Sequence, residues 1–414
     1  MPKQPADQPI PSKRVGKLLM AVLLAVAVSY TAFSGVTPQP QTTSTISPTL
    51  ESPTSLGDKW ENLGRIYKDE SNPILQEFWL LGRYHGQYHW SDGSAGQDEG
   101  FETRRHRLGF QARLLEKLSI HAQMVSGSDF EPFYNGFTEL WAQWAFSEEI
   151  ALTIGQQKHR FTHDRNVSSR YINYLERSML TNMFGADYTP AVTLLGRIDK
   201  ITYYTGLFSN ATGTDMGEAF TDLNSGYSFL AAAYYDLGKS LGTDTAQIHF
   251  TYLHSDANEN ATNLNRFDNG ISSALILTKG STAMVTEVTA GLGSEDGDAV
   301  ALNFQPSYFL TDNLQIVGRY QLAGSNNSVG LNPQRRYERP AGLPSGDLYQ
   351  AAYVGLNYHI AKHRLKLMTG LEYATMGGEE VWTASTMVRF FFGPHSGGAF
   401  PMNQMAPGHF FHHD

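Results

Sequence analysis

The stretch EIALTIGQQK, residues Glu149–Lys158, decides the interpretation of this chain, because it alternates strictly and is followed by a long segment that does not. Apolar side chains occupy its even positions up to Ile154, and smaller or polar side chains such as Thr153 and Gln157 occupy its odd positions. Such period-2 alternation is typical of a β-strand with two different environments. It stops over HRFTHDRNVSSRYINYLERSMLTNMFGADY (His159–Tyr188) and resumes in two strands joined at Asp199–Lys200.

The interruption at His159–Tyr188 is long for a connection inside a compact domain, and such loops are usually functional. It is also basic, because its arginines and the preceding Lys158 outnumber Asp164, Glu176 and Asp187. We interpret it as a loop that folds into a transmembrane β-barrel and narrows the lumen.

The composition fits a β-barrel. Aromatic residues make up 12% of the 414 residues, charged residues only 17%, and 39 residues are glycine. A typical soluble domain carries about 25% charged residues. Cysteine is absent, so the chain has neither disulfides nor thiol chemistry.

The N-terminal region predicts export. Lys13, Arg14 and Lys17 precede the apolar run Leu18–Val28, and small residues follow it, which is the pattern of a signal peptide. The run is too short to span a bilayer as a helix, which needs about 20 residues. We predict a signal peptide over residues 1–34, a disordered Pro/Thr/Ser linker over 35–57 and a short periplasmic segment over 58–73, in which 58–67 favours a helix.

From residue 74 to residue 392 the chain is a succession of alternating segments whose links alternate in length. We predict long links at 91–100, 126–135, 159–188, 209–224, 255–266 and 324–346, moderate links at 293–297 and 376–380, and short links at 115–117, 147–148, 199–200, 238–243, 279–280, 311–313 and 361–363. Short turns on one rim and long loops on the other are typical of outer-membrane barrels. The fold class is therefore all-β: a transmembrane antiparallel β-barrel of about 16 strands, with the third long loop folded inward.

The net charge of −9 at first favours cation passage, but the distribution over the two strand faces favours anions. Leu108 and Phe110 share the lipid face of one strand, so Arg105 and Arg107 point into the lumen. A charged side chain facing lipid at mid-depth costs about 2–4 kcal/mol, which enforces that assignment. Clear lumen acids are fewer: Glu139, Glu287 and Glu372.

Rings of Arg and Lys select anions in pores, and guanidinium groups fork onto phosphate or carboxylate oxygens. The predicted pore-lining, anion-binding residues are Arg83, Arg105, Arg107, Arg113, Lys158, Arg160, Arg165, Arg170, Arg177, Arg197, Lys200, Arg319, Arg364, Lys366 and Arg389. The alternative is that these cations brace the lumen acids and serve stability alone. We expect no catalytic residue, no resident metal, no cofactor and no nucleic-acid partner.

Four passages resemble the phosphate-selective porin O and P family: NPILQEFWLLGRYHGQYHW (Asn72–Trp90), RRHRLGFQARLLEKLSIHAQM (Arg104–Met124), NYLERSMLTNMFG (Asn173–Gly185) and YVGLNYHIAKHRLKLMTGLEY (Tyr353–Tyr373). The resemblance implies a sixteen-stranded outer-membrane barrel, a homotrimer and passive passage of small anions. It also implies an arginine ladder that binds phosphate, and Arg105, Arg107 and Arg113 have that character. The sequence departs from the family pattern after residue 392, where a His/Met/Pro-rich tail (393–414) continues; its histidines give the alternative of a metal-binding tail.

Three other functions remain open. An oligosaccharide channel would use Tyr203, Tyr204, Trp141 and Tyr353 as a sugar slide. A structural or adhesive barrel would have no open pore. A hydrolase would need a nucleophile hydrogen-bonded to a base, for which His163, Asp164, Ser168 and Ser169 are the candidates.

Overall fold

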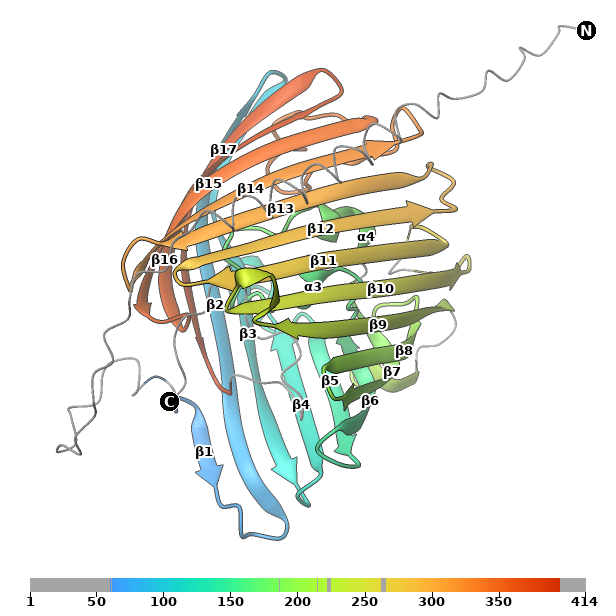
Figure 1. Cartoon of the computed structure of the whole chain (residues 1–414), viewed down its shortest axis with the longest axis vertical. Helices are drawn as coiled ribbons and strands as arrows, with labels where there is room; N and C mark the ends of the chain where they lie inside the picture. Colours follow the sequence, from blue (N-terminus) through green and yellow to red (C-terminus); the bar gives the residue numbers. More distant parts are fainter. Residues whose placement is uncertain are drawn as a thin grey trace, which may run out of the picture.

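Sixteen antiparallel strands close into one barrel in the computed structural model, which describes residues 60, 62–185, 187–213, 215–221, 225–261 and 266–394 (Figure 1). Each strand from β2 to β17 pairs with the next one along the chain, and β17 pairs with β2 to close the ring. The predicted architecture and strand number are therefore confirmed. No helix among these residues has the length and apolar character needed to cross a bilayer.

The elements follow in chain order. The strands are β1 (Arg65–Lys68), β2 (Leu75–Gly93), β3 (Gly96–Leu114), β4 (Leu118–Val125), β5 (Phe137–Ala145), β6 (Ile150–Lys158), β7 (Tyr188–Ile198), β8 (Ile201–Ser209), β9 (Gly226–Gly238), β10 (Thr245–Ala257), β11 (Asn269–Lys279), β12 (Thr282–Leu292), β13 (Ala299–Phe309), β14 (Leu314–Ser325), β15 (Leu348–Ala361), β16 (Leu365–Met376) and β17 (Glu379–Phe392). The short helices are α3 (His163–Asn166), α4 (Met179–Phe184) and α5 (Glu218–Thr221), and the 3-10 turns are η1 (Ser128–Phe130) and η2 (Ser240–Gly242).

Alternation sets which side chains face outward. Along β15 every second residue is exposed, including Val354 and Leu356, while the alternate residues, including Tyr353 and Asn357, are buried. Leu80 and Phe110 are likewise exposed on β2 and β3, whereas Arg83 and Arg107 are buried. Because successive side chains of a strand point to opposite faces, an apolar outer surface leaves the charged groups inside.

Three sequence-based boundaries are wrong. The predicted long link at 91–100 is a two-residue turn, since β2 runs to Gly93 and β3 begins at Gly96. Its acidic residues alternate at the ends of two long strands, where Asp98 lies 2.8 Å from His89, rather than in a loop. The link at 376–380 is also a two-residue turn, because Gly377 (φ 62°) and Gly378 (φ 85°) supply the two positive φ angles of a tight hairpin.

The third correction concerns the segment before the barrel. The predicted helix at 58–67 is wrong over residues 65–67, because Arg65–Lys68 form strand β1 and pair with β2. Pairing with the exposed edge at the end of the long β2 satisfies backbone groups that a short isolated helix would leave to water. The signal peptide and linker (1–57) and the tail beyond Pro394 lie outside the described residues.

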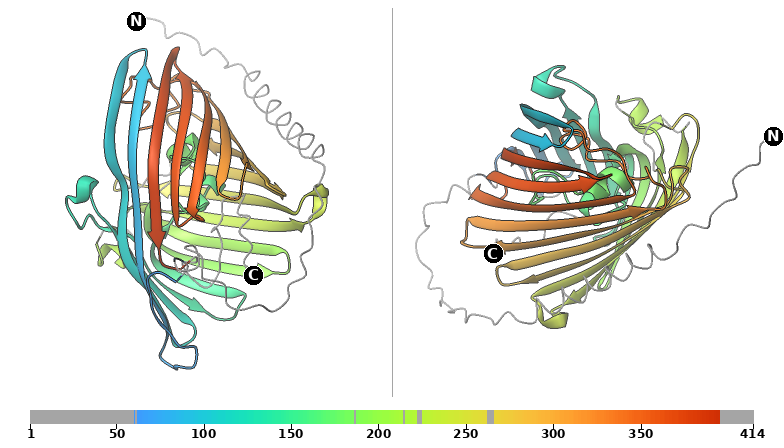
Figure 2. Two further views of the ribbon diagram at one scale, coloured as in Figure 1. Left: turned by 90° about the vertical axis from the view of Figure 1, so that its left-hand side faces the viewer. Right: turned by 90° about the horizontal axis from the view of Figure 1, so that it is seen from above.

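The segment between β6 and β7, residues 159–187 and hereafter the β6–β7 loop, carries α3 and α4 and lies within the ring of strands (Figure 2). Its apolar side chains pack on inward-facing residues of the wall. Tyr174 and Leu175 lie in one cluster with Val317, Tyr353 and Met387. A second cluster joins Tyr171 and Ile172 to Phe391 at the end of β17. The loop is therefore fixed to the β14–β17 side of the barrel.

Candidate functional site

A pocket open to solvent lies between the β6–β7 loop and the wall formed by strands β2 to β8, and is hereafter called the passage. It encloses about 1090 Å³, including space open to solvent. Amide side chains of β3 to β6 form one side, among them Gln111, Gln123 and Gln143. The loop contributes Ser168, Ser169 and other residues of its first half.

Cations outnumber acids in this passage. The lining includes Arg83 from β2, Lys158 from β6 and the loop residues Arg160 and Arg170, whereas Glu139 of β5 is its one carboxylate within the described residues. Arg160 and Arg170 are partly exposed. The Arg160 guanidinium lies 5.6 Å from the ring centre of Tyr204, a distance at which cation–π attraction orients it.

The remaining passage cations, Arg83 and Lys158, are buried and donate to the β6–β7 loop. Arg83 is buried and its Nη1 donates to Ser169 Oγ at 2.7 Å. Lys158 Nζ donates to the carbonyl oxygens of Arg165 at 3.2 Å and Asn166 at 3.1 Å, at the end of α3. Both groups add positive charge to the passage while holding the loop in place.

A second group of predicted cations holds the far side of the β6–β7 loop. Lys366 Nζ donates to the carbonyl of Ile172 at 2.9 Å, and Arg389 donates to the same carbonyl at 2.8 Å. Arg319 donates to the carbonyl of Glu176 at 2.8 Å and to the Glu372 carboxylate at 2.7 Å. These cations are fully desolvated, so the loop carbonyls and acids replace their hydration.

Within the loop, Arg177 and Asp164 form the internal scaffold. Arg177 donates to the carbonyl of Val167 at 2.5 Å and to that of Asp164. The Asp164 carboxylate accepts from Ser178 N at 3.1 Å and Thr181 Oγ1 at 2.6 Å. Burial by itself would raise the pKa of Asp164, but the Arg177 charge and these hydrogen bonds lower it below its usual range.

The other predicted cations lie away from the passage. Arg107 Nη1 donates to the Tyr188 hydroxyl at 2.8 Å, Arg165 pairs with Asp187 at 2.6 Å, and Arg105 lies 3.4 Å from His85 Nδ1. Four lie on the rim that carries the turns at 115–117, 199–200 and 362–364. They are Arg113, which pairs with Glu70, Arg364, which donates to the carbonyl of Gly393, and the exposed Arg197 and Lys200. The structure thus divides one predicted set into a passage group, a loop-holding group and peripheral groups.

Sequence reasoning missed several inward groups because the alternation is broken. A β-bulge between His85 and Gly86 leaves Arg104 without a partner on β2, and its side chain reaches Glu176 of the loop. Such a bulge turns neighbouring residues of one strand to the same side. The β14–β15 loop (residues 326–347) was predicted as a long link at 324–346, but its contacts with the wall were not, among them the ion pair of Arg336 with Glu102 of β3.

The alternative sites are not assembled in the structure. Tyr203 and Tyr204 are neighbours on β8 and face opposite sides, and Tyr353 packs on Tyr174 at 5.5 Å, so only Tyr204 and Trp141 of the proposed sugar slide line the passage. His163 Nδ1 lies 3.1 Å from His249 Nδ1, and Ser168 Oγ accepts from Arg170. His163 and Ser168 thus contact other side chains, and these contacts do not form a nucleophile–base pair between the two.

Glu338 of the β14–β15 loop gives a pH prediction. Burial raises its pKa to about 7, the nearby Glu372 adds to the rise, and the hydrogen bonds from Tyr349 (2.7 Å) and Gln334 N (2.6 Å) only partly oppose it, as does the charge of Arg319. Because the folded-state pKa lies above the ordinary 4.5, the protonated form stabilises the loop fully below pH 4.5, and this contribution is lost as the pH rises through about 7.

We therefore expect hydrogen exchange in residues 331–349, corrected for intrinsic rates, to become faster between acidic and alkaline pH in the parent protein. Glu338→Gln should remove that pH dependence, because the amide keeps the neutral form at every pH. Glu295→Gln, in the exposed β12–β13 link, is the matched control and should retain it. Equal pH dependence in both variants would contradict the assignment to Glu338.

Comparisons with known proteins agree with this geometry. The family model described as "Phosphate-selective porin O and P" matches residues 80–379, more than half of the chain. A search of curated protein sequences found no significant match. Similar solved structures include Pseudomonas putida OprB, with a TM-score of 0.56 at 12% identity over 76% of this chain and 94% of that one.

Two further structures have similar scores. The anion-selective porin from Comamonas acidovorans has a TM-score of 0.54 at 12% identity, covering 76% of this chain and 99% of that chain. Salmonella typhi OmpF, in a complex with daunomycin, has a TM-score of 0.54 at 10% identity, covering 79% of this chain and all of that chain (100%). At these identities the likeness shows a common fold.

Proposed function

The chain belongs to the phosphate-selective porin O and P family, and from that premise we propose that it is a passive diffusion channel for small hydrophilic solutes that favours anions. The family and the fold establish an outer-membrane porin. The preference of the channel for anions is our proposal beyond the family assignment. The Comamonas acidovorans relative is described as anion-selective, which supports it.

One observation carries the proposal: four cations and one carboxylate line the passage. Counting Arg83, Lys158, Arg160 and Arg170 against Glu139 leaves an excess of three positive charges over these five side chains. Positive groups along a pore lower the free energy of an anion and raise that of a cation. Partly exposed guanidinium groups also offer paired N–H donors to phosphate or carboxylate oxygens.

Measurement of the reversal potential across a KCl gradient in a planar bilayer tests the proposal. We expect the sign of the potential to report chloride passing faster than potassium. Phosphate titrated into the chloride solution tests the narrower form, in which phosphate binds in the passage and reduces the chloride current. Faster passage of potassium in the unmutated channel would overturn the anion preference, and block by oligosaccharides but not phosphate would favour the sugar channel.

Loss of the Glu139 carboxylate should change the chloride-to-potassium permeability ratio in the opposite direction to loss of a passage cation. Replacing Glu139 by Gln removes the carboxylate of the passage lining and should increase the chloride-to-potassium permeability ratio by roughly two- to tenfold, the effect of one nearby charge in a water-filled site. The ratio follows from the reversal potential. Glu149→Gln, at an exposed tight turn, is the control and should leave the ratio unchanged. A ratio that falls in Glu139→Gln would contradict the prediction.

We further propose that the chain assembles as a homotrimer in the outer membrane, in contact with lipid over the rest of its apolar outer surface. Leu80, Phe110, Val354 and Leu356 belong to that surface and are exposed in the single chain. Chemical cross-linking in detergent tests the assembly: a ladder ending at three chains is expected, and a barrel that stays single at all reagent concentrations would contradict it.

A further inference from the structure

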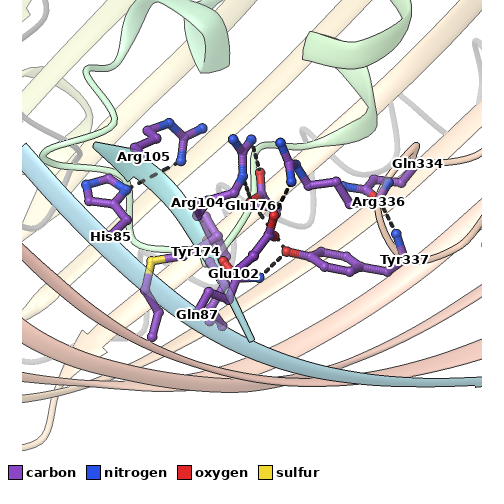
Figure 3. Close-up of polar contacts among 12 residues, drawn as sticks. His85, Gln87, Glu102, Arg104, Arg105, Tyr174, Glu176, Gln334, Arg336 and Tyr337 are labelled. Carbon is purple, nitrogen blue, oxygen red and sulfur yellow. Dashed lines mark hydrogen bonds and ion pairs between the residues drawn. The ribbon is translucent and has the colours of Figure 1, made fainter. Parts of the chain in front are cut away.

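The Glu176 carboxylate of the β6–β7 loop joins three parts of the barrel (Figure 3). Arg104 of β3 donates to both of its oxygens, with an Nη2–Oε2 distance of 2.9 Å. The Tyr337 hydroxyl, from the β14–β15 loop, lies 3.4 Å from Oε1. Gln87 of β2 donates in turn to that hydroxyl. A paired, two-point contact of this kind fixes orientation as well as distance.

The β14–β15 loop is attached to the same side of the barrel by other contacts. Its Arg336 donates to the Glu102 carboxylate of β3, and the Tyr337 ring lies 4.8 Å from the ring of His89 on β2. Tyr337 is only 5% exposed. Two loops that are separated along the chain therefore share one attachment point on β2 and β3.

The position of Glu176 is transmitted to the passage through the backbone of its own loop. Arg177, the next residue, donates to the carbonyls of Asp164 and Val167, and Val167 precedes the passage residues Ser168–Arg170. The Glu176 carbonyl is held from the other side by Arg319. These hydrogen bonds connect Glu176 to the segment that carries Arg170, so we expect a displacement at Glu176 to shift that segment.

The surroundings of Glu176 favour its ionised form. Burial alone would raise its pKa, but the charge and hydrogen bonds of Arg104 lower it far below the usual range. Both partners are largely buried, with side-chain exposures of 17% for Arg104 and 10% for Glu176. Removing either partner leaves the other with weaker compensation in a largely buried site, which is costly.

We propose that Arg104 and Glu176 form a positioning pair that sets the width of the passage by holding the β6–β7 and β14–β15 loops against β3. The inference rests on the proposed function only in that the passage must conduct. The pair does not bind the solute. It determines where the solute-facing part of the β6–β7 loop stands, and Tyr337 couples the second loop to the same carboxylate.

Single-channel recording of Glu176→Gln tests the pair. Loss of the charge weakens the contact that holds both loops to β3, so we expect a single conductance level in the parent and several levels in the variant, with a several-fold increase in open-channel current noise. The exchanged variant, Arg104→Glu with Glu176→Arg, restores an ion pair and should return the noise toward that of the parent. A Glu176→Gln channel as quiet as the parent, or an exchanged variant no quieter than Glu176→Gln, would overturn the proposal.

A second pair of variants keeps the test decisive if Glu176→Gln does not fold. The chain has no cysteine, so Arg104→Cys with Glu176→Cys places two unique thiols. Joining them with a short bifunctional thiol reagent should suppress the noise of the unlinked variant, whereas modification by a monofunctional reagent should not. Tyr337→Phe keeps the ring and removes only the hydroxyl, and should show a smaller increase in noise. Equal noise in linked and unlinked channels would count against the pair.

The anion preference and the positioning pair are tested by different measurements, so either can be rejected while the other stands. The reversal potential of the parent channel reports the anion preference, whereas noise and its rescue by charge exchange report the positioning pair. A cation-preferring parent in which charge exchange rescues Glu176→Gln would reject the anion preference and retain the pair. An anion-preferring parent without rescue would do the reverse.

Discussion

Reversing the charge of Arg160 and Arg170 together is expected to turn the channel from anion-preferring to cation-preferring. The five charged passage residues then change from an excess of three positive charges to an excess of one negative charge, because each substitution by Glu changes the local charge by two. The two arginines are the partly exposed cations of the passage, so their charges act on the solute directly.

The effect should be large. One charge acting on a monovalent ion at about 4 Å in water is worth about 1 kcal/mol, and about 1.4 kcal/mol corresponds to a tenfold ratio. Two reversals should therefore change the chloride-to-potassium permeability ratio by at least about tenfold and reverse the sign of the potential across a KCl gradient. High salt should reduce the difference, since screening shortens the range of the charges.

Arg197→Glu with Lys200→Glu is the matched control, with the same change in net charge. Both side chains are exposed at the 199–200 turn, outside the passage. We expect only a small change in the ratio. If this rim variant reversed the selectivity as strongly as Arg160→Glu with Arg170→Glu, the preference would depend on the overall charge of the mouth rather than on the passage.

The second large effect is expected from Lys366→Met with Arg389→Met. These two buried cations donate to the backbone carbonyl of Ile172, and Arg389 also donates to those of Tyr174 and Leu175 at 3.2 and 3.3 Å. Each buried carbonyl left without a donor costs about 1–3 kcal/mol. The middle of the β6–β7 loop should therefore detach from β16 and β17.

Two measurements detect that detachment. Single-channel conductance should rise, because the loop no longer occupies a fixed part of the bore, and limited proteolysis should cut within residues 167–178 in the double variant only. Lys200→Met, which removes an exposed rim cation, should change neither. An unchanged conductance in the double variant would show that apolar packing through Tyr174, Leu175 and Tyr171 is sufficient to hold the loop.

The sequence predicts the barrel well because one rule holds for every strand: apolar side chains face the lipid and charged side chains face the lumen. The rule assigns Leu108 and Phe110 outward and Arg105 and Arg107 inward, as the structure has them, without knowledge of any contact. It fails at Arg104, where one extra residue in β3 shifts the alternation. It also fails at 91–100, where acidic residues at the ends of long strands resemble a loop in composition.

The sequence does not predict which of the inward-facing cations line the passage and which hold the β6–β7 loop. Lys366, Arg389 and Arg319 are cations that face inward as Arg83 does, yet they donate to carbonyls of the β6–β7 loop. Every residue has a backbone carbonyl, so no sequence signal marks the acceptors. No periodic sequence pattern predicts the inward course of the β14–β15 loop, which brings Tyr337 beside Glu176.

The way the chain leaves β17 matters for anyone who purifies this protein. Phe392 and Pro394 both line the passage, and the carbonyl of Pro394 accepts a hydrogen bond from Arg170 at 2.7 Å. Whatever polypeptide is joined downstream therefore starts at the conducting path. An affinity tag or fluorescent domain fused directly after Pro394 is tethered there, and electrical recordings of such fusions need to be compared with protein from which the label has been cleaved.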